Sequence, residues 1–141
     1  MDDDRGQVAK MVAPQRLPGG STDEIVVHNP SRRQVEQAIR HLDGEGFHDL
    51  FLYPAISDVE TFLGIGGGAG RYFVGISDHA ERVGQVLNTK DPSDVREDIM
   101  CGGQVTSVPR RFLVDLQTAV TAAVHYLDTA AAAPALSWEW C

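Results

Sequence analysis

Residues 59–76 read VETFLGIGGGAGRYFVGI, and this stretch decides the fold class. The apolar and aromatic runs 59–63 and 71–76 are typical of β-strands, and Gly64-Ile65-Gly66-Gly67-Gly68-Ala69-Gly70 separates them. Glycine adopts positive φ angles at little cost, so this segment suits the turn of a tight hairpin. Strands joined by a tight turn pair antiparallel, which predicts an antiparallel sheet at the centre of the molecule.

Further strands are expected on both sides of this hairpin. Short apolar or alternating runs bounded by polar, glycine or proline residues occur at residues 25–27, 50–53, 83–87, 99–101, 104–108 and 136–140. Consecutive strands with short connections favour antiparallel pairing throughout, because a parallel crossover needs a longer connection.

Two helices frame these strands in the sequence. Ser31 can cap a first helix, whose apolar positions recur at helical spacing as far as Leu42. Asp115 can cap a second helix, whose apolar stripe extends to Leu127. We therefore predict an α+β fold, a mainly antiparallel sheet of about five to seven strands with two main helices packed on one face.

The length of 141 residues suits one domain and is too short for two comfortable cores. Residues 1–22 mix charges, two prolines and a Gly19-Gly20 pair without a sustained period. We predict that residues 1–22 form a flexible N-terminal tail and that residues 23–141 form a single domain.

Composition narrows the possible partners. The net charge of -8 and the pI near 4.9 disfavour direct binding to nucleic acid or to an anionic membrane, and favour a basic partner. The other interpretation is that acidity only keeps the protein soluble. The acidic N-terminus does not resemble a signal peptide, and no apolar run spans a bilayer, so a cytoplasmic location is expected.

The glycine-rich loop also offers an alternative function. It contains a G-x-G-x-x-A pattern, which binds a dinucleotide when a helix follows and its N-terminus meets the pyrophosphate. Here the strand-like run from Arg71 follows instead, and no G-K-S/T occurs in the chain. A hairpin is therefore the favoured interpretation, with a small-molecule or nucleotide-binding regulatory domain that uses residues 64–70 as the alternative.

Catalytic and metal-binding patterns are weak. None of the five histidines stands four residues from another, so a helical metal site is not indicated. His79 with Asp78 and Glu81 forms a histidine–carboxylate cluster that is more typical of a solvated turn. Cys101 has no identifiable base near it in the sequence. We predict that the protein is not an enzyme and has no cofactor or metal, and an enzyme using Cys101 or the His79 cluster is the least favoured hypothesis.

Acidic residues suggest a surface for a cationic partner. They concentrate between the central strands and could steer and orient such a partner, although a solvated acidic rim explains them equally well. Trp140 could anchor the interface from an accessible edge, whereas Trp138 is more typical of core packing. The predicted partner-interface residues are Asp78, Glu81, Asp91, Asp94, Glu97, Asp98 and Trp140.

A second group of residues is predicted to shape the fold. Glycines at turns or bulges, a helix cap and a core tryptophan have structural roles that do not require contact with a partner. These residues are Gly66, Gly67, Gly68, Gly70, Gly102, Gly103, Asp115 and Trp138.

Taken in order, several short motifs resemble one known family. The chain is similar to the actinobacterial immunity proteins encoded beside polymorphic toxins, and especially to the branch that accompanies deaminase-type toxins. The similarity covers about residues 25–140. The motifs that carry it are Asn29-Pro30-Ser31, Leu42-Asp43-Gly44, Gly66-Gly67-Gly68-Ala69-Gly70-Arg71-Tyr72, Gly102-Gly103-Gln104, Pro109-Arg110-Arg111, Val114-Asp115-Leu116, Ala119, Ala122-Ala123, His125-Tyr126-Leu127 and Leu136-Ser137-Trp138-Glu139.

This resemblance implies a protein that binds and neutralises a cognate toxin domain. A deaminase toxin binds nucleic acid, so its cleft is expected to be basic and to surround a zinc-bound water. An acidic inhibitor could occupy such a cleft, compete there with the phosphates of the nucleic acid and block the entry of its bases. The resemblance transfers no contact residues, because the matching positions are mainly structural.

Overall fold

The computed structural model describes residues 8–16, 19, 21–55, 58–78, 82–101 and 104–141. Its centre is the hairpin of β4 (Phe62–Gly68) and β5 (Arg71–Asp78), as predicted. The glycine run is not all turn, because most of it belongs to β4. The turn itself consists of Ala69 and Gly70, both with positive φ angles (55° and 92°), which matches the twist of a two-residue hairpin.

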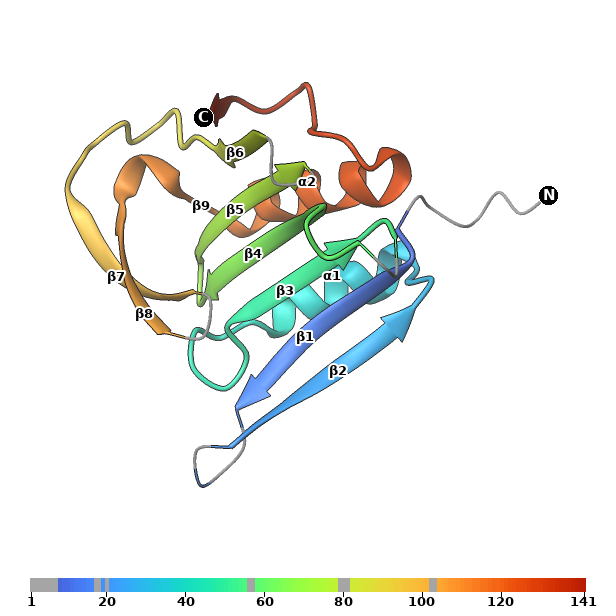
Figure 1. The fold of residues 1–141 in the computed structure, drawn as a ribbon. Coiled ribbons are helices and arrows are strands. Elements are labelled where there is room, and N and C mark those ends of the chain that lie inside the picture. Colours follow the sequence, from blue (N-terminus) through green and yellow to red (C-terminus); the bar gives the residue numbers. More distant parts are fainter. Residues whose placement is uncertain (1–7, 17–18, 20, 56–57, 79–81, 102–103) are drawn as a thin grey trace.

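The main sheet confirms the α+β, mainly antiparallel architecture (Figure 1). Seven strands follow the order β10-β6-β5-β4-β3-β1-β2, and β9 pairs with β5, so the described sheet has eight strands. The sheet therefore exceeds the expected size. The remaining strands are β1 (Lys10–Arg16), β2 (Thr22–His28), β3 (Asp49–Tyr53), β6 (Arg82–Val86), β9 (Leu113–Val114) and β10 (Trp138–Trp140).

Strand β1 corrects the prediction of a flexible tail over residues 1–22. It lies between β2 and β3 and pairs with both of them. Met11 is 4% exposed and belongs to the main core. Pro14 obscured this strand in the sequence, yet it is tolerated, because β1 pairs with β3 only over residues 10–12 and Pro14 lies outside that ladder. Residues 1–7, 17–18 and 20 lie outside the described part of the chain.

A second, two-stranded sheet is formed by β7 (Arg96–Cys101) and β8 (Gln104–Pro109). This hairpin lies beside the ends of β4 and β5 (Figure 1), and the 3-10 helix η1 (Arg110–Phe112) connects it to β9. A small core holds it in place. That core consists of Val108, Phe112 and Leu113, packed against Phe73, Leu87 and Ile99.

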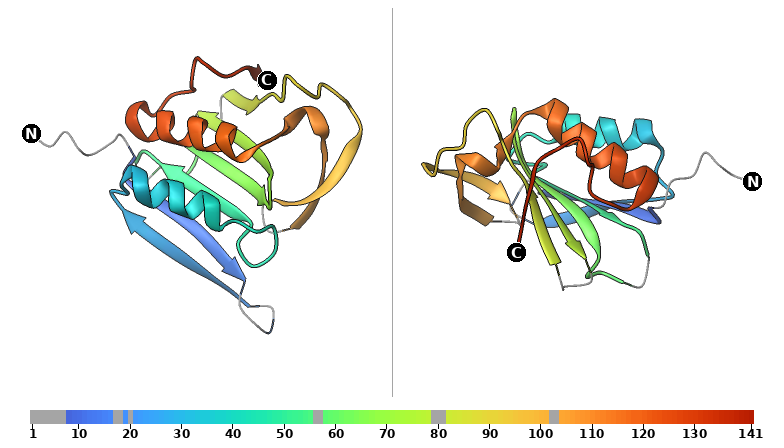
Figure 2. Two further views of the ribbon diagram at one scale, coloured as in Figure 1. Left: turned by 180° about the vertical axis from the view of Figure 1, so that it is seen from behind. Right: turned by 90° about the horizontal axis from the view of Figure 1, so that it is seen from above.

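Both helices cover the same face of the main sheet, as predicted (Figure 2). They are α1 (Arg32–His41) and α2 (Leu116–Thr129), and neither is long and apolar enough to cross a membrane. The core between helices and sheet contains side chains such as Ile39 from α1, Ala123 from α2 and Leu50, Leu63 and Val74 from the strands. No helix of the described residues lies on the other face of the sheet.

The predicted helix caps are confirmed. Ser31 and Gln34 form a reciprocal capping box at the start of α1. Asp115 caps α2, and its Oδ1 accepts a hydrogen bond of 2.8 Å from the amide of Thr118. Hydrogen bonds from Thr118 lower the pKa of Asp115 below its ordinary value.

Replacing Asp115 with alanine should therefore destabilise the protein by about 1 kcal/mol at pH 7. Because the folded-state pKa lies below the unfolded one, the contribution is complete above about pH 4 and is lost as the pH falls through the folded value. Chemical denaturation of wild type, Asp115→Ala and Asp115→Asn at several pH values measures this. The asparagine variant should keep most of the stability. Equal stability of the wild type and the alanine variant at pH 7 would contradict the assignment.

Candidate functional site

The helix-free face of the sheet is built from three cross-strand rows. In antiparallel pairs, residues directly opposite each other share a face, so the register assigns each row to one side. The first row contains Phe62, Ser77 and Val83; the second contains Phe51, Gly64, Gly75 and Gln85; the third contains Asp49, Gly66 and Phe73.

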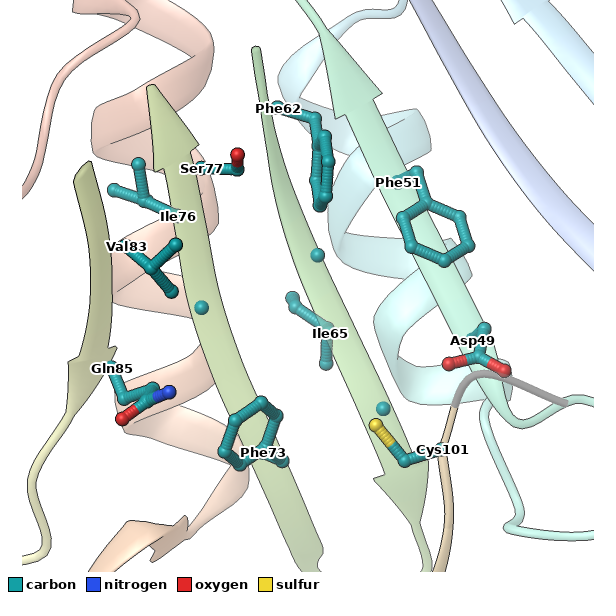
Figure 3. A pocket seen from close by; sticks show the side chains of 13 residues that line it. Asp49, Phe51, Phe62, Ile65, Phe73, Ile76, Ser77, Val83, Gln85 and Cys101 are labelled. Atoms are coloured by element: carbon teal, nitrogen blue, oxygen red, sulfur yellow. The ribbon is translucent and has the colours of Figure 1, made fainter. Parts of the chain in front are cut away.

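Two glycines that lie opposite each other leave a gap between side chains in the second row. Gly64 and Gly75 face each other across β4 and β5, so neither contributes a side chain between Phe51 and Gln85. The Phe51 ring lies against Gly64, and the space above Gly75 stays open. The result is an open groove with a volume of about 320 Å³ (Figure 3). Two phenylalanines from β3 and β4 flank it on one side, and Phe73, Val83 and Gln85 flank it on the other.

Aromatic side chains make the groove mainly apolar. The ring centroids of Phe51 and Phe62 are 5.8 Å apart in an edge-to-face arrangement, and Tyr53 lies 5.8 Å from Phe62. Val83 is 39% exposed beside them. Partly exposed aromatic side chains around a hollow are typical of positions that anchor a protein interface.

A buried polar pair lies at the β7 end of the groove. Asp49 lines the groove, and its Oδ2 is 2.5 Å from Nδ1 of His48. Both side chains are 4% exposed, which means that the pair is buried and hydrogen-bonded. Asp49 thus places a carboxylate at one end of an otherwise apolar surface.

Cys101 closes the same end of the groove. The β7–β8 hairpin approaches β4 here because Gly66 has no side chain: a Cβ at that position would lie 2.6 Å from the Cys101 Sγ. Burial, with a smaller contribution from the charge of Asp49, raises the pKa of Cys101 to about 11. A thiol with this pKa stays protonated at neutral pH, so the structure gives no support to Cys101 as a nucleophile.

The predicted acidic residues fall into different environments. Glu97 is 16% exposed and pairs with both Arg71 and Arg110, so its charge is compensated within the chain. These hydrogen bonds, the one from Arg71 first, lower the pKa of Glu97. Asp94 pairs with Arg111 but remains 85% exposed, so this pair is weak and the carboxylate stays open to solvent.

Other carboxylates on the same segment are placed differently. Glu97 faces β5, so by strand alternation Asp98 points to the opposite side of β7, where it is exposed. Asp91 is half-buried in the loop between β6 and β7. The structure thus brings Asp91, Asp94, Glu97 and Asp98 to one segment without forming a single carboxylate cluster.

Two predicted interface residues lie away from the groove. Asp78 is exposed at the end of β5, opposite Arg82. Trp140 pairs with Gly84, and since Val83 and Gln85 line the groove, Trp140 lies on the other face of the sheet. The Arg82 guanidinium lies 4.2 Å from the centre of the Trp140 ring. Glu81, like His79 of the proposed cluster, is outside the described residues.

The residues predicted to have structural roles lie at close backbone contacts and in the main core. Gly67 and Gly68 have φ angles of 96° and 143° at the end of β4, where the backbone passes close to Arg71 and Gly44. Trp138 packs against the main core, and its Nε1 donates a hydrogen bond of 2.9 Å to the carbonyl of Ala133. Gly102 and Gly103, at the predicted second turn, lie outside the described part of the chain.

Sequence reasoning missed the groove residues. A signal was present, because Phe51 and Tyr53 alternate with Leu50 and Leu52 and make β3 apolar on both faces. A strand that is apolar on both faces is expected to be covered on both faces. Here the helices cover only one of them. Within the described residues, no group of three or more histidine, cysteine or acidic side chains could hold a metal ion.

In the described part of the chain, helices pack on one face of the sheet and the other face is open and carries aromatic side chains. The model of the immunity protein family Imm1 matches residues 22–140, and the chain therefore belongs to the Imm1 family of immunity proteins. A cognate toxin is thus its partner. Searches of curated proteins and of solved structures returned no match.

Proposed function

We propose that the chain neutralises a polymorphic toxin by pressing its helix-free sheet face against the toxin domain. The hollow between Phe51 and Gln85, created by Gly64 and Gly75, is the observation that carries this proposal. A protruding apolar or aromatic side chain of the toxin would fill it. Anchor residues of this kind, buried in a pocket at the centre of an interface, supply most of the binding energy in many complexes.

The toxin is proposed to be a nucleic-acid deaminase whose substrate cleft the chain occludes. The substrate cleft of such an enzyme attracts phosphates and surrounds a zinc-bound water, so it is expected to be basic. A net charge of -8 favours encounter with a basic surface. The family membership supports a toxin as the partner. The choice of a deaminase is supported by the similarity of the ordered motifs to the deaminase-associated branch of actinobacterial immunity proteins.

The exposed carboxylate of Asp98 should steer the encounter. Replacing Asp98 with lysine should lower the association rate constant several-fold at low salt and less at 0.5 M salt, because screening removes long-range attraction. Stopped-flow mixing with the toxin domain measures this. The matched control is Asp128→Lys, an equal charge change on α2. If both variants slow association equally, only net charge matters and Asp98 has no steering role.

Inhibition of the toxin tests the function itself. The toxin encoded beside this chain should lose its deaminase activity when the two proteins are mixed at near-equimolar ratio. Undiminished deamination at a several-fold excess of this chain would overturn the proposal. Inhibition of an adjacent toxin with a different activity would retain the immunity function and contradict the deaminase assignment.

The alternative, nucleotide binding by residues 64–70, has less support. Strand β5 follows the glycines directly, so no helix N-terminus is available to meet a phosphate. A thermal-shift screen with nucleotides tests it, since a ligand that binds the native state raises the melting temperature.

A further inference from the structure

Strand β2 forms a long unpaired edge of the main sheet. It has seven residues, and among the described residues it pairs with β1 alone; it is the outermost strand of the sheet in Figure 1. Every second residue of such a strand directs its N–H and C=O groups away from the sheet. The opposite edge, β10, has only three residues.

Strand β2 has few of the features that usually protect an edge. Protected edges carry charged residues, proline or a bulge, or lie under a helix or loop. The acidic residues of β2, Asp23 and Glu24, lie toward its N-terminal end and leave its centre uncharged. The sequence of β2, TDEIVVH, contains neither proline nor lysine, and its seven residues pair with β1 one for one, without a bulge. Ile25 and Val26 at its centre are each 44% exposed. The edge therefore offers both backbone hydrogen-bonding groups and apolar surface to another strand.

We propose that a second copy of this chain pairs with β2, antiparallel and centred on Val26. A two-fold axis perpendicular to the sheet keeps the helices of both copies on one side, so only residues of the same face can stand opposite each other. Glu24, Val26 and His28 share the helix-free face, since the register aligns them with Pro14, Val12 and Lys10 of β1.

The side chains of β2 are self-complementary in this register. Val26 faces Val26 of the second copy at the axis, and Ile25 faces Val27. Glu24 stands opposite His28 at each end, a pairing of an acidic with a basic side chain that favours the register. The groove lies nearer the centre of the sheet, along β3 to β6, so this pairing extends the sheet and leaves the groove open to the toxin.

Sedimentation equilibrium of the full chain tests the pairing. The wild type should form a concentration-dependent dimer, and Val26→Lys should raise its dissociation constant at least about 10-fold, because two like charges then meet at the axis. The control Val59→Lys, at a position 62% exposed outside the strands, should leave the dissociation constant unchanged.

A charge exchange tests the register independently of folding. Glu24→Lys and His28→Glu should each weaken the dimer several-fold, and the double variant should recover wild-type affinity to within about 3-fold. A wild type that stays monomeric at about 1 mM, or single variants that dimerise unchanged, would overturn the proposal. A third result would also overturn the proposal: the wild type is monomeric, and the Val26→Lys variant no longer binds the toxin. The edge strand would then pair with a strand of the toxin and not with a second copy.

Discussion

Replacing Gly75 with isoleucine should leave the fold intact and lower toxin affinity at least about 100-fold, which corresponds to roughly 3 kcal/mol. The φ angle of Gly75 lies outside the left-handed region, and a Cβ there would meet its nearest atom, the Gly84 carbonyl oxygen, at 3.4 Å. A β-branched side chain therefore fits the strand. It would project into the hollow opposite Gly64 and occupy the space proposed for the toxin.

Titration calorimetry against the purified toxin domain measures this loss. Gln37→Ile serves as the matched control, because it places the same side chain on an exposed position of α1, on the other side of the sheet. The control should bind as the wild type does. Wild-type affinity of Gly75→Ile, with the fold verified by circular dichroism, would remove the groove from the interface.

Replacing Gly67 with alanine should destabilise the protein by about 3 kcal/mol or more. Gly67 has a φ angle of 96°, which side chains other than glycine adopt only under strain, and a Cβ there would lie 2.3 Å from the carbonyl oxygen of Arg71. Strained backbone and overpacking each cost roughly 1–3 kcal/mol. The clash involves the backbone of β5, which cannot move without disturbing the central hairpin.

Denaturant unfolding of Gly67→Ala and Gly75→Ala measures the difference directly. The two substitutions are chemically identical and lie on the paired strands β4 and β5, but Gly75 has an unstrained φ and contacts only at ordinary distances. Gly75→Ala should change the free energy of unfolding by less than about 1 kcal/mol. Similar effects at both positions would show that the conformation of Gly67 is not essential.

The sequence predicted those parts of the fold that local chemistry determines. Ser31 and Asp115 cap their helices because each side chain reaches an amide only three residues ahead. The hairpin of β4 and β5 follows from residues adjacent in the chain. Likewise, two helices on one face of an antiparallel sheet follow from the order of the elements.

Features that depend on the pairing of strands far apart in the sequence were not predictable. Strand β1 has a proline and a basic residue at each end, and only its position between β2 and β3 makes it a strand. The groove needs the register of four strands at once, which the two-residue turn at Ala69 and Gly70 helps to fix.

The ion pairs of the acidic segment could not be predicted for the same reason, because they join residues that are distant in the chain. Glu97 was expected to face a partner, but Arg71 and Arg110, 26 and 13 residues away, pair with it in the folded chain. Spacing along the chain does not indicate such pairs. Asp98, on the outward side of β7, is exposed and forms none of these pairs.

Nuclear magnetic resonance mapping of the complex tests the binding face most directly. Amide signals of isotopically labelled chain, titrated with a catalytically inactive toxin domain, report on each strand, and glycine amides resonate in a distinct region of the spectrum. The signals of Gly64, Gly66 and Gly75 should shift strongly while those of the exposed side of α1 stay in place. Strong shifts along α1 and α2 with unchanged groove glycines would contradict binding through the open face of the sheet.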